Sequence, residues 1–154
     1  MCKAVHDHRA EIGIALDGDA DRCILVDEKG NILDGDVVLA ILAIDRMKRG
    51  LLKQNAIVAT VMSNLGLEKL LKSHGISLIR AKVGDRYVLE EMLKKGCDIG
   101  GEQSGHTIFL DYQTTGDGML TALGILEIMA REQKSLSELA APFVRFPQKI
   151  VNVQ

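Results

Sequence analysis

The stretch of sequence that decides the fold is residues 56–101, AIVATVMSNLGLEKLLKSHGISLIRAKVGDRYVLEEMLKKGCDIGG. Its short apolar runs are bounded by glycine or by polar and charged residues, as strands are: 56–61, 76–79 and the weaker 97–100. Between these runs lie segments with the apolar periodicity of a helix, residues 65–74 and 85–95. Strands that alternate with helices of this length predict an α/β fold, a layered α/β/α domain with a mixed sheet.

The alternation continues on either side of this stretch. Helices are predicted over residues 36–49 and 117–131, and a strand is predicted over residues 107–110. A short helix is predicted after Ser135, because Ser135 and Glu138 have the spacing of a capping box.

The beginning of the chain has a different pattern. Apolar runs at residues 12–16 and 23–26 predict strands, and the turn at residues 27–31 joins the second run to residues 32–33 as in a hairpin. The predicted division of the chain is a mostly β segment over 1–33, the α/β domain over 34–145 and a connector over 146–154, with 150–153 rich in β-formers.

The composition excludes several classes of protein. The chain has 154 residues, of which 47% are hydrophobic, and 19 Lys and Arg face 21 Asp and Glu, so it is typical of a folded globular protein. A net charge of -2 offers no basic field for nucleic acid. The longest apolar run, residues 37–44, is too short to cross a membrane, and no apolar signal core opens the chain, so we expect a cytoplasmic protein. The 3 cysteines show no CxxC spacing and predict no zinc site or disulfide framework.

A cluster of acidic residues follows the run at 12–16. Asp17, Asp19 and Asp21 alternate along a loop, and hard divalent cations prefer several such oxygen ligands. Without a cation, repulsion among the carboxylates would raise their pKa values. Arg22 follows them directly, and its guanidinium is suited to binding a phosphate whose other oxygens bind the cation. The alternative is that Arg22 only neutralises the charge of an acidic surface turn.

The same residues leave two rival interpretations open. Asp17, Asp19, Asp21 and Glu28 have the spacing of a calcium-binding EF-hand loop, although Arg22 stands where that loop needs glycine and the flanks read as strands. An aspartyl-phosphate phosphatase would use Asp17 as nucleophile and Asp19 as acid and base, but Asp21 departs from its pattern.

Further along the chain, residues 100–106 form a glycine-rich polar loop. Glu102, Ser104 and His106 offer an acceptor, a hydroxyl and an imidazole at alternate positions, which suits the hydroxyls of a sugar. By itself such a loop is common, and a lone histidine is often structural.

Two strand-to-helix junctions complete the set of motifs. Lys82 and Arg86 flank a helix start that Asp85 can cap, so this junction is either an anion site or a capped helix with surface charge. Residues 114–118 predict only a helix start, capped by Thr115 or Asp117.

Together these motifs resemble a known family. Residues 17–22 resemble the metal-binding loop of the α-D-phosphohexomutases, and residues 101–106 resemble their sugar-binding loop. Residues 81–88 and 114–118 are similar to bacterial members that act on glucosamine phosphate, and the similarity continues through residues 146–153. The two loops occur in the order and separation found in the family.

The resemblance implies a four-domain enzyme that interconverts glucosamine 6-phosphate and glucosamine 1-phosphate through a phosphoserine and a bisphosphate intermediate. This chain would supply the end of the second domain and the third domain, with Mg²⁺ as cofactor, and its partners would be a phosphorylated amino sugar and the missing domains. The roles implied are metal binding by Asp17, Asp19 and Asp21, catalysis by Arg22 and His106, and substrate binding by Glu102, Ser104, His106, Lys82 and Arg86.

The chain also departs from the family pattern. Ala20 stands where glycine is frequent, which is tolerable if its backbone angles are ordinary. No Ser-His-Asn segment carries a phosphoserine, and no Arg-x-Ser-Gly-Thr-Glu-Pro loop binds the distal phosphate. We therefore expect the chain alone to have no mutase activity.

Overall fold

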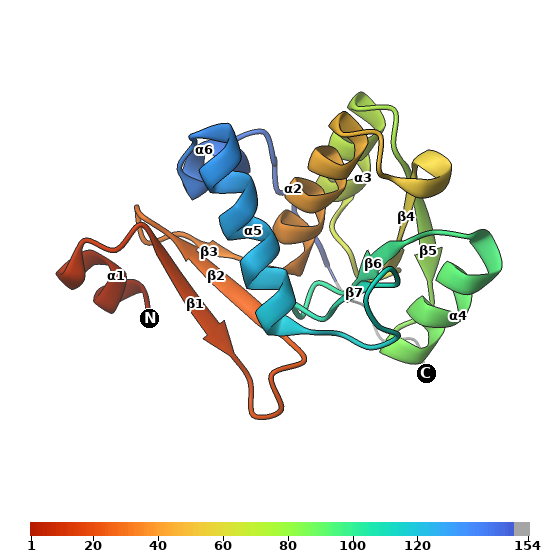
Figure 1. Ribbon diagram of the computed structural model, residues 1–154, viewed down its shortest axis with the longest axis horizontal. Coiled ribbons are helices and arrows are strands. Elements are labelled where there is room, and N and C mark those ends of the chain that lie inside the picture. Colours follow the sequence, from red (N-terminus) through yellow and green to blue (C-terminus); the bar gives the residue numbers. More distant parts are fainter. Residues whose placement is uncertain (150–154) are drawn as a thin grey trace.

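A computed structural model describes residues 1–149, so the predicted β-rich segment at 150–153 lies outside the described residues. The first part of the chain forms an antiparallel sheet in the order β1-β2-β3, from β1 (Ile12–Leu16), β2 (Cys23–Asp27) and β3 (Ile32–Leu33). Helix α1 (Cys2–His8) packs against β1 and β2 (Figure 1). The hairpin turns tightly after Asp27, whose carboxylate accepts hydrogen bonds from the backbone of Asn31 and Lys29.

The second sheet has the order β5-β4-β6-β7. The central strand β4 (Ala56–Thr60) pairs in parallel with β5 (Ser77–Ala81) and β6 (Ile99–Gly101), and β7 (Thr107–Phe109) runs antiparallel to β6. This arrangement confirms the predicted mixed sheet. All residues of β4 are buried, because the strand is covered on both faces, which explains its uninterrupted apolar sequence.

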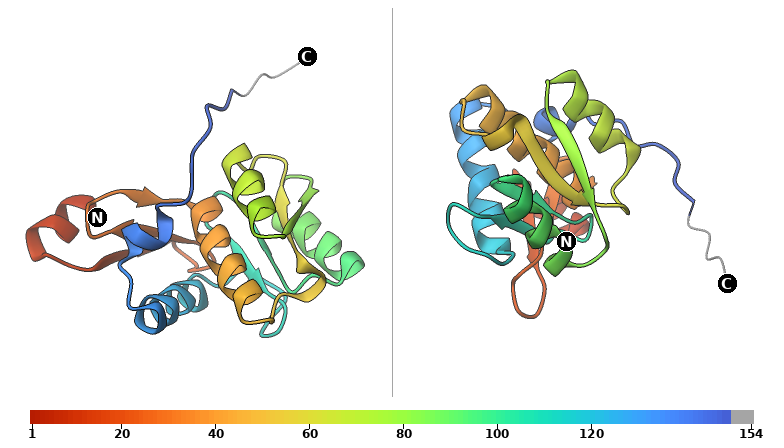
Figure 2. Two further views of the ribbon diagram at one scale, coloured as in Figure 1. Left: turned by 90° about the horizontal axis from the view of Figure 1, so that it is seen from above. Right: turned by 90° about the vertical axis from the view of Figure 1, so that its right-hand side faces the viewer.

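Helices cover both faces of this sheet. α2 (Gly35–Lys48) and α3 (Leu65–Ser73) pack on one face, where Ile57 and Ala59 of β4 join their core. α4 (Asp85–Lys95) packs on the other face against Ala56 and Val58. The α/β/α layering is therefore confirmed (Figure 2).

The remaining helices join the two sheets. α5 (Gly118–Glu132) packs against α2 and also against β1 and β2, and α6 (Leu136–Ala140) packs against α2. The two sheets lie toward opposite ends of the molecule, with α5 between them (Figures 1 and 2). A single 3₁₀ turn, η1 (Lys53–Asn55), precedes β4. Among residues 1–149, no helix combines the length and the apolar character needed to cross a membrane.

The structure corrects the sequence prediction at two helix starts. α1 was not predicted, because Val5 is its single buried residue and one apolar side chain shows no helical periodicity. At α4 the N-cap is Gly84, which makes no side-chain cap, whereas Asp85 is the first helical residue and accepts a hydrogen bond from the Arg86 amide at 2.6 Å. The predicted capping box of Ser135 and Glu138 is confirmed.

Candidate functional site

The motifs gather at one edge of the larger sheet. β4, β5 and β6 are parallel, so the loops that follow β5 and β6 leave the sheet at the same edge, where α/β proteins commonly bind ligands. The loop at residues 17–22, which joins β1 to β2, reaches this edge through backbone pairing. Arg22 bridges to His106, and the Cys23 amide donates to the Gly105 carbonyl at 3.1 Å. The acidic loop and the 101–106 loop are thus neighbours, although about 80 residues separate them in sequence.

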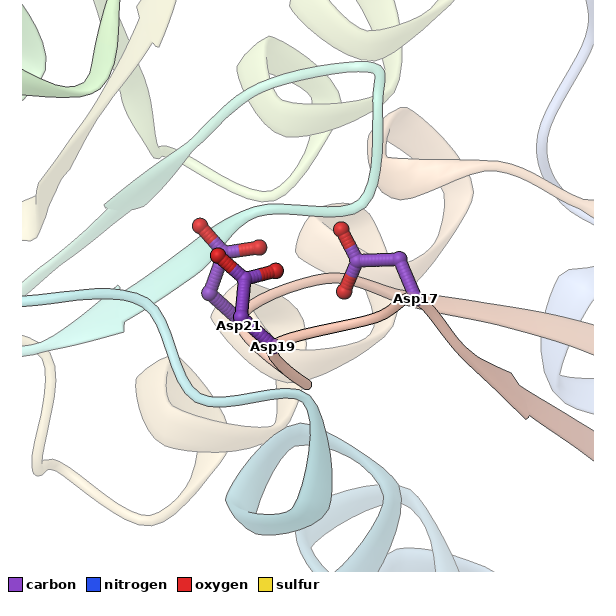
Figure 3. Close-up of side chains that lie close together, drawn as sticks. All are labelled: Asp17, Asp19 and Asp21. Carbon is purple, nitrogen blue, oxygen red and sulfur yellow. The ribbon is translucent and has the colours of Figure 1, made fainter.

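The carboxylates of Asp17, Asp19 and Asp21 converge. One oxygen from each lies within 4.8 Å of the others, and Figure 3 shows the Asp17 carboxylate facing those of Asp19 and Asp21. The donor set is purely carboxylate oxygen, which fits a hard divalent cation such as Mg²⁺. The three carboxylates and the Arg22 guanidinium together carry a formal charge of about −2, which one divalent cation would cancel.

Arg22 partly neutralises this cluster. Its Nε lies 2.8 Å from Asp17 Oδ2 and 3.3 Å from Asp21 Oδ1, and its backbone amide donates to Asp17 Oδ1 at 3.2 Å. Burial raises the pKa of Asp17, but the Arg22 amide and guanidinium lower it by more, so the pKa lies below its ordinary value. The expectation that repulsion raises these pKa values is therefore wrong for Asp17, because Arg22 supplies the compensating charge.

The acidic loop is held in an unusual backbone conformation. Ala20 has a φ of 61°, in the left-handed region that favours glycine, so its backbone angles are not ordinary. The Ala20 carbonyl accepts a hydrogen bond from the Gly118 amide at 2.9 Å. Residues 114–118, to which the sequence assigned no chemistry, therefore contact the acidic loop directly.

The calcium-module alternative does not fit the structure. Glu28 would be the final ligand of the EF-hand loop, yet the five residues of β2 separate it from the acidic loop, a span of about 16 Å at 3.3 Å per residue. Its carboxylate instead accepts hydrogen bonds from the backbone amide and hydroxyl of Ser137. The flanking segments are strands, so the helix–loop–helix of an EF-hand is absent from residues 12–27.

His106 lies between the two loops. Its side chain is 3% exposed, and its Nε2 accepts a hydrogen bond from the Gly116 amide at 3.2 Å and lies 3.6 Å from Asp21 Oδ2. Its other ring nitrogen, Nδ1, is buried and has no hydrogen-bond partner among residues 1–149. His106 thus links the two loops, and its catalytic role stays a prediction.

The 101–106 loop is tightly folded and presents one hydroxyl outward. The Glu102 amide donates to the His106 carbonyl at 2.9 Å, and the Gly105 amide donates to the Glu102 carbonyl at 3.0 Å. Gly105 has a φ of 99°, which other residues rarely adopt. Ser104 is exposed at the tip of the loop, where it is free to meet a ligand.

Glu102 connects this loop to the start of α4. Its Oε1 accepts a hydrogen bond from the Gly84 amide at 3.1 Å, so the loops after β5 and β6 are fixed to each other. Lys82 and Arg86 are exposed at the same junction. The Arg86 Nε lies 2.8 Å from Glu90 Oε1, so part of its charge is paired on the surface of α4.

Sequence reasoning missed two residues at the start of α2, Gly35, which supports the 101–106 loop, and Asp36, which binds the start of α3. The Gly35 amide donates to the Gln103 carbonyl at 3.0 Å, and a Cβ at Gly35 would lie 2.0 Å from the Glu102 carbonyl oxygen. Asp36, fully buried, accepts a hydrogen bond from the Asn64 amide at 2.7 Å, and burial raises the pKa of its carboxyl. The available signal in the sequence was Gly35, which directly precedes the helix predicted over residues 36–49. A glycine at such a position indicates that another main-chain segment approaches closely.

Comparison with known proteins gives the following relatives. Residues 34–146 match the family described as phosphoglucomutase/phosphomannomutase, alpha/beta/alpha domain III. Phosphoglucosamine mutase of Caldanaerobacter subterraneus subsp. tengcongensis is 61% identical over 150 residues, which cover 97% of this chain and 34% of that protein. The chain therefore spans about a third of the length of this curated relative.

Solved structures show the same fold. A phosphoglucomutase/phosphomannomutase family protein from Burkholderia thailandensis matches with a TM-score of 0.83 and 29% identity, covering 94% of this chain and 31% of that one. An N-acetylphosphoglucosamine mutase from Aspergillus fumigatus, in complex with GlcNAc-6P and magnesium, matches with a TM-score of 0.69 and 22% identity. This second match covers 87% of the present chain and 33% of the fungal one.

Proposed function

Because the chain belongs to the phosphoglucomutase/phosphomannomutase family, we propose that it carries the metal-binding and sugar-binding loops of a phosphoglucosamine mutase. That isomerase interconverts glucosamine 6-phosphate and glucosamine 1-phosphate. The observation that carries the proposal is the backbone bridge between Arg22 and His106, which puts a carboxylate cluster beside a loop rich in sugar-binding groups.

The acidic loop is assigned to Mg²⁺. Asp17, Asp19 and Asp21 would hold the ion, which suits their oxygen donors, and the fungal relative with the same fold contains magnesium. When bound, the ion neutralises charge on phosphoryl oxygens. Arg22 is half exposed, so its guanidinium can turn from the carboxylates toward a phosphoryl group.

The 101–106 loop is assigned to the sugar. Ser104 offers its exposed hydroxyl, and Glu102 binds the Gly84 amide through Oε1, which leaves Oε2 for a sugar hydroxyl. Lys82 and Arg86 flank the N-terminus of α4 and would attract the substrate phosphate. His106, whose Nε2 accepts from Gly116, would keep the sugar loop and the acidic loop in register.

The proposed reaction needs groups beyond this sequence. In the family a phosphoserine donates its phosphoryl group, the resulting bisphosphate reorients, and the other phosphoryl group returns to the serine. The sequence contains neither the phosphoserine segment nor the distal phosphate loop. We therefore expect the chain alone to bind its sugar phosphate without turning it over.

An NMR titration tests the sugar assignment. Glucosamine 6-phosphate added to the labelled chain, with and without MgCl₂, should shift amides of residues 101–106. Ser104→Ala should weaken these shifts several-fold, because the variant loses a hydrogen bond worth about 1 kcal/mol. Ser73→Ala, at an exposed position on α3, is the matched control and should leave them unchanged. Absence of shifts in this loop would contradict the assignment.

The same sample discriminates the phosphatase alternative. A mutase fragment releases no inorganic phosphate from glucosamine 6-phosphate. An aspartyl-phosphate enzyme would release phosphate only with MgCl₂ and would lose this activity in Asp17→Asn.

A further inference from the structure

The segment Gly116–Gly118, directly before and at the start of α5, contacts both candidate loops. The Gly118 amide donates to the Ala20 carbonyl at 2.9 Å, on the acidic-loop side. The Gly116 amide donates to His106 Nε2 at 3.2 Å, on the sugar-loop side. The segment is itself fixed to β7, because the Asp117 amide donates to the Thr107 carbonyl at 3.2 Å.

Both glycines are required by close packing. A Cβ at Gly116 would lie 2.4 Å from the His106 ring and 2.8 Å from the Asp21 carbonyl oxygen. A Cβ at Gly118 would lie 2.6 Å from the Arg22 carbonyl oxygen. Neither glycine has a positive φ, so backbone conformation does not explain them. Their role is to let this segment lie directly on the main chain of residues 20–22.

These contacts fall where they can orient the carboxylates. The carbonyl groups of Ala20, Asp21 and Arg22 each meet Gly116 or Gly118, and Ala20 lies between Asp19 and Asp21 in an unfavourable left-handed conformation. The hydrogen bond to the Ala20 carbonyl helps to hold that conformation. The directions of the Asp19 and Asp21 side chains follow from it.

We propose that Gly116–Gly118 is a positioning clamp that presets the spacing of the Asp17, Asp19 and Asp21 carboxylates for a divalent cation. Through His106 the same segment also fixes the position of the acidic loop relative to the 101–106 loop. This inference rests on the proposed metal site. The clamp contributes no ligand atom, and its effect on the cation comes only from the main chain that it holds. Groups that orient metal ligands in this way change metal affinity by about 10–100-fold when lost.

Manganese binding tests the clamp. Mn²⁺ prefers the same oxygen ligands as Mg²⁺ and can be followed by electron paramagnetic resonance as MnCl₂ is added to the chain. We expect Gly116→Ala and Gly118→Ala to weaken Mn²⁺ binding by about tenfold or more. Gly124→Ala, inside α5, is the control, because its Cβ would meet only the flexible end of Leu42 at 3.2 Å and should leave the affinity unchanged.

The outcomes separate the two claims. If the unmodified chain binds no Mn²⁺, the proposed metal site is wrong and the clamp is wrong with it. If the unmodified chain binds Mn²⁺ and both clamp variants bind equally well, only the clamp is wrong. Because a Cβ at either glycine meets main-chain atoms, both variants should melt at a lower temperature, so the titration is made well below that temperature. A weaker Mn²⁺ affinity of the folded variants, with the affinity of Gly124→Ala unchanged, supports the clamp.

Hydrogen exchange gives a test that needs no substitution. If the clamp exists before the cation binds, the Gly118 amide of the metal-free chain exchanges slowly, because it is bonded to the Ala20 carbonyl. Exchange at the rate of an unprotected amide, with protection appearing only after MgCl₂ is added, would overturn the proposal. This measurement can overturn the proposal even if a glycine variant fails to fold.

Discussion

Replacing Asn64 with serine should release the segment around residue 146 while leaving the start of α3 intact. Asn64 is 2% exposed and is the N-cap of α3, where its Oδ1 accepts from the Gly66 amide at 2.9 Å. The same side chain also pairs with the backbone of Phe146, accepting from its amide at 2.9 Å and donating to its carbonyl at 2.8 Å. Serine caps helices as well as asparagine does but is too short to reach Phe146.

The magnitude follows from the two hydrogen bonds to the Phe146 backbone that are lost, and it is a lower bound because the bond from Asn64 Nδ2 to Gln148 Oε1, at 3.3 Å, is lost as well. Each contributes about 1 kcal/mol, so the local free energy of opening at Phe146 should fall by about 2 kcal/mol. Since 1.4 kcal/mol corresponds to a factor of ten, the protection of the Phe146 amide against exchange should fall about 30-fold. Amides within α3 should change little, because their cap is retained.

Hydrogen exchange followed by NMR measures both quantities in one sample. Arg145→Ala is the matched control, since it removes only a surface ion pair of 2.8 Å with Asp34 from the same segment. A half-exposed pair of this kind is worth at most about 1 kcal/mol, so the control should lose less than about fivefold in protection. Equal protection of Phe146 in Asn64→Ser and the unmodified chain would refute the reasoning.

Three further outcomes follow from the described contacts. Asp98→Ala should lower the free energy of unfolding in urea by about 1.5–3 kcal/mol, because Arg46 and the Lys53 amide lose a buried charged acceptor while Arg46 keeps Asp111, and a loss below about 1 kcal/mol would contradict this. Ala20→Gly should raise stability by about 0.5–1 kcal/mol, since relief of the left-handed conformation exceeds the entropy cost of glycine; a decrease would show that the conformation is not strained. Burial raises the pKa of Glu28, but hydrogen bonds from Ser137, from its own backbone and from Ser135 together lower it by more. The Glu28 carboxylate therefore stabilises the fold above its ordinary pKa of 4.5, and this stability is lost as the pH falls through the lower pKa of the folded state. Ser137→Ala should therefore flatten the acid limb of a stability-against-pH curve, and an unchanged limb would rule out this linkage.

The sequence predicted most of the larger sheet because its strands are short apolar runs bounded by polar residues. The alternation of these strands with helices also predicted the layered α/β fold class. Both predictions depend on local pattern and on general rules of α/β folds. They needed no knowledge of how distant segments pack.

The sequence could not predict the features that depend on tertiary approach. The contact of Gly116 with the His106 ring joins residues from different elements, and a glycine before a helix also has the local explanation of a helix start. Asp85 has good capping chemistry, but the N-cap of α4 is Gly84, whose amide donates to Glu102 and whose φ of 125° favours glycine. Such choices are made by packing, which local propensity does not record.

The candidate site is divided between two sheets, so its geometry depends on the helices that join them. α2 begins at the sugar loop, where the Gly35 amide binds the Gln103 carbonyl, and α5 begins at the acidic loop, where the Gly118 amide binds the Ala20 carbonyl. The two helices pack against each other through a shared core. A shift of α5 relative to α2 would therefore strain the direct backbone contacts between the two loops, the bridge from Arg22 to His106 and the hydrogen bond from Cys23 to Gly105. Close packing in that core resists such a shift, and it keeps a site assembled from distant segments in one geometry.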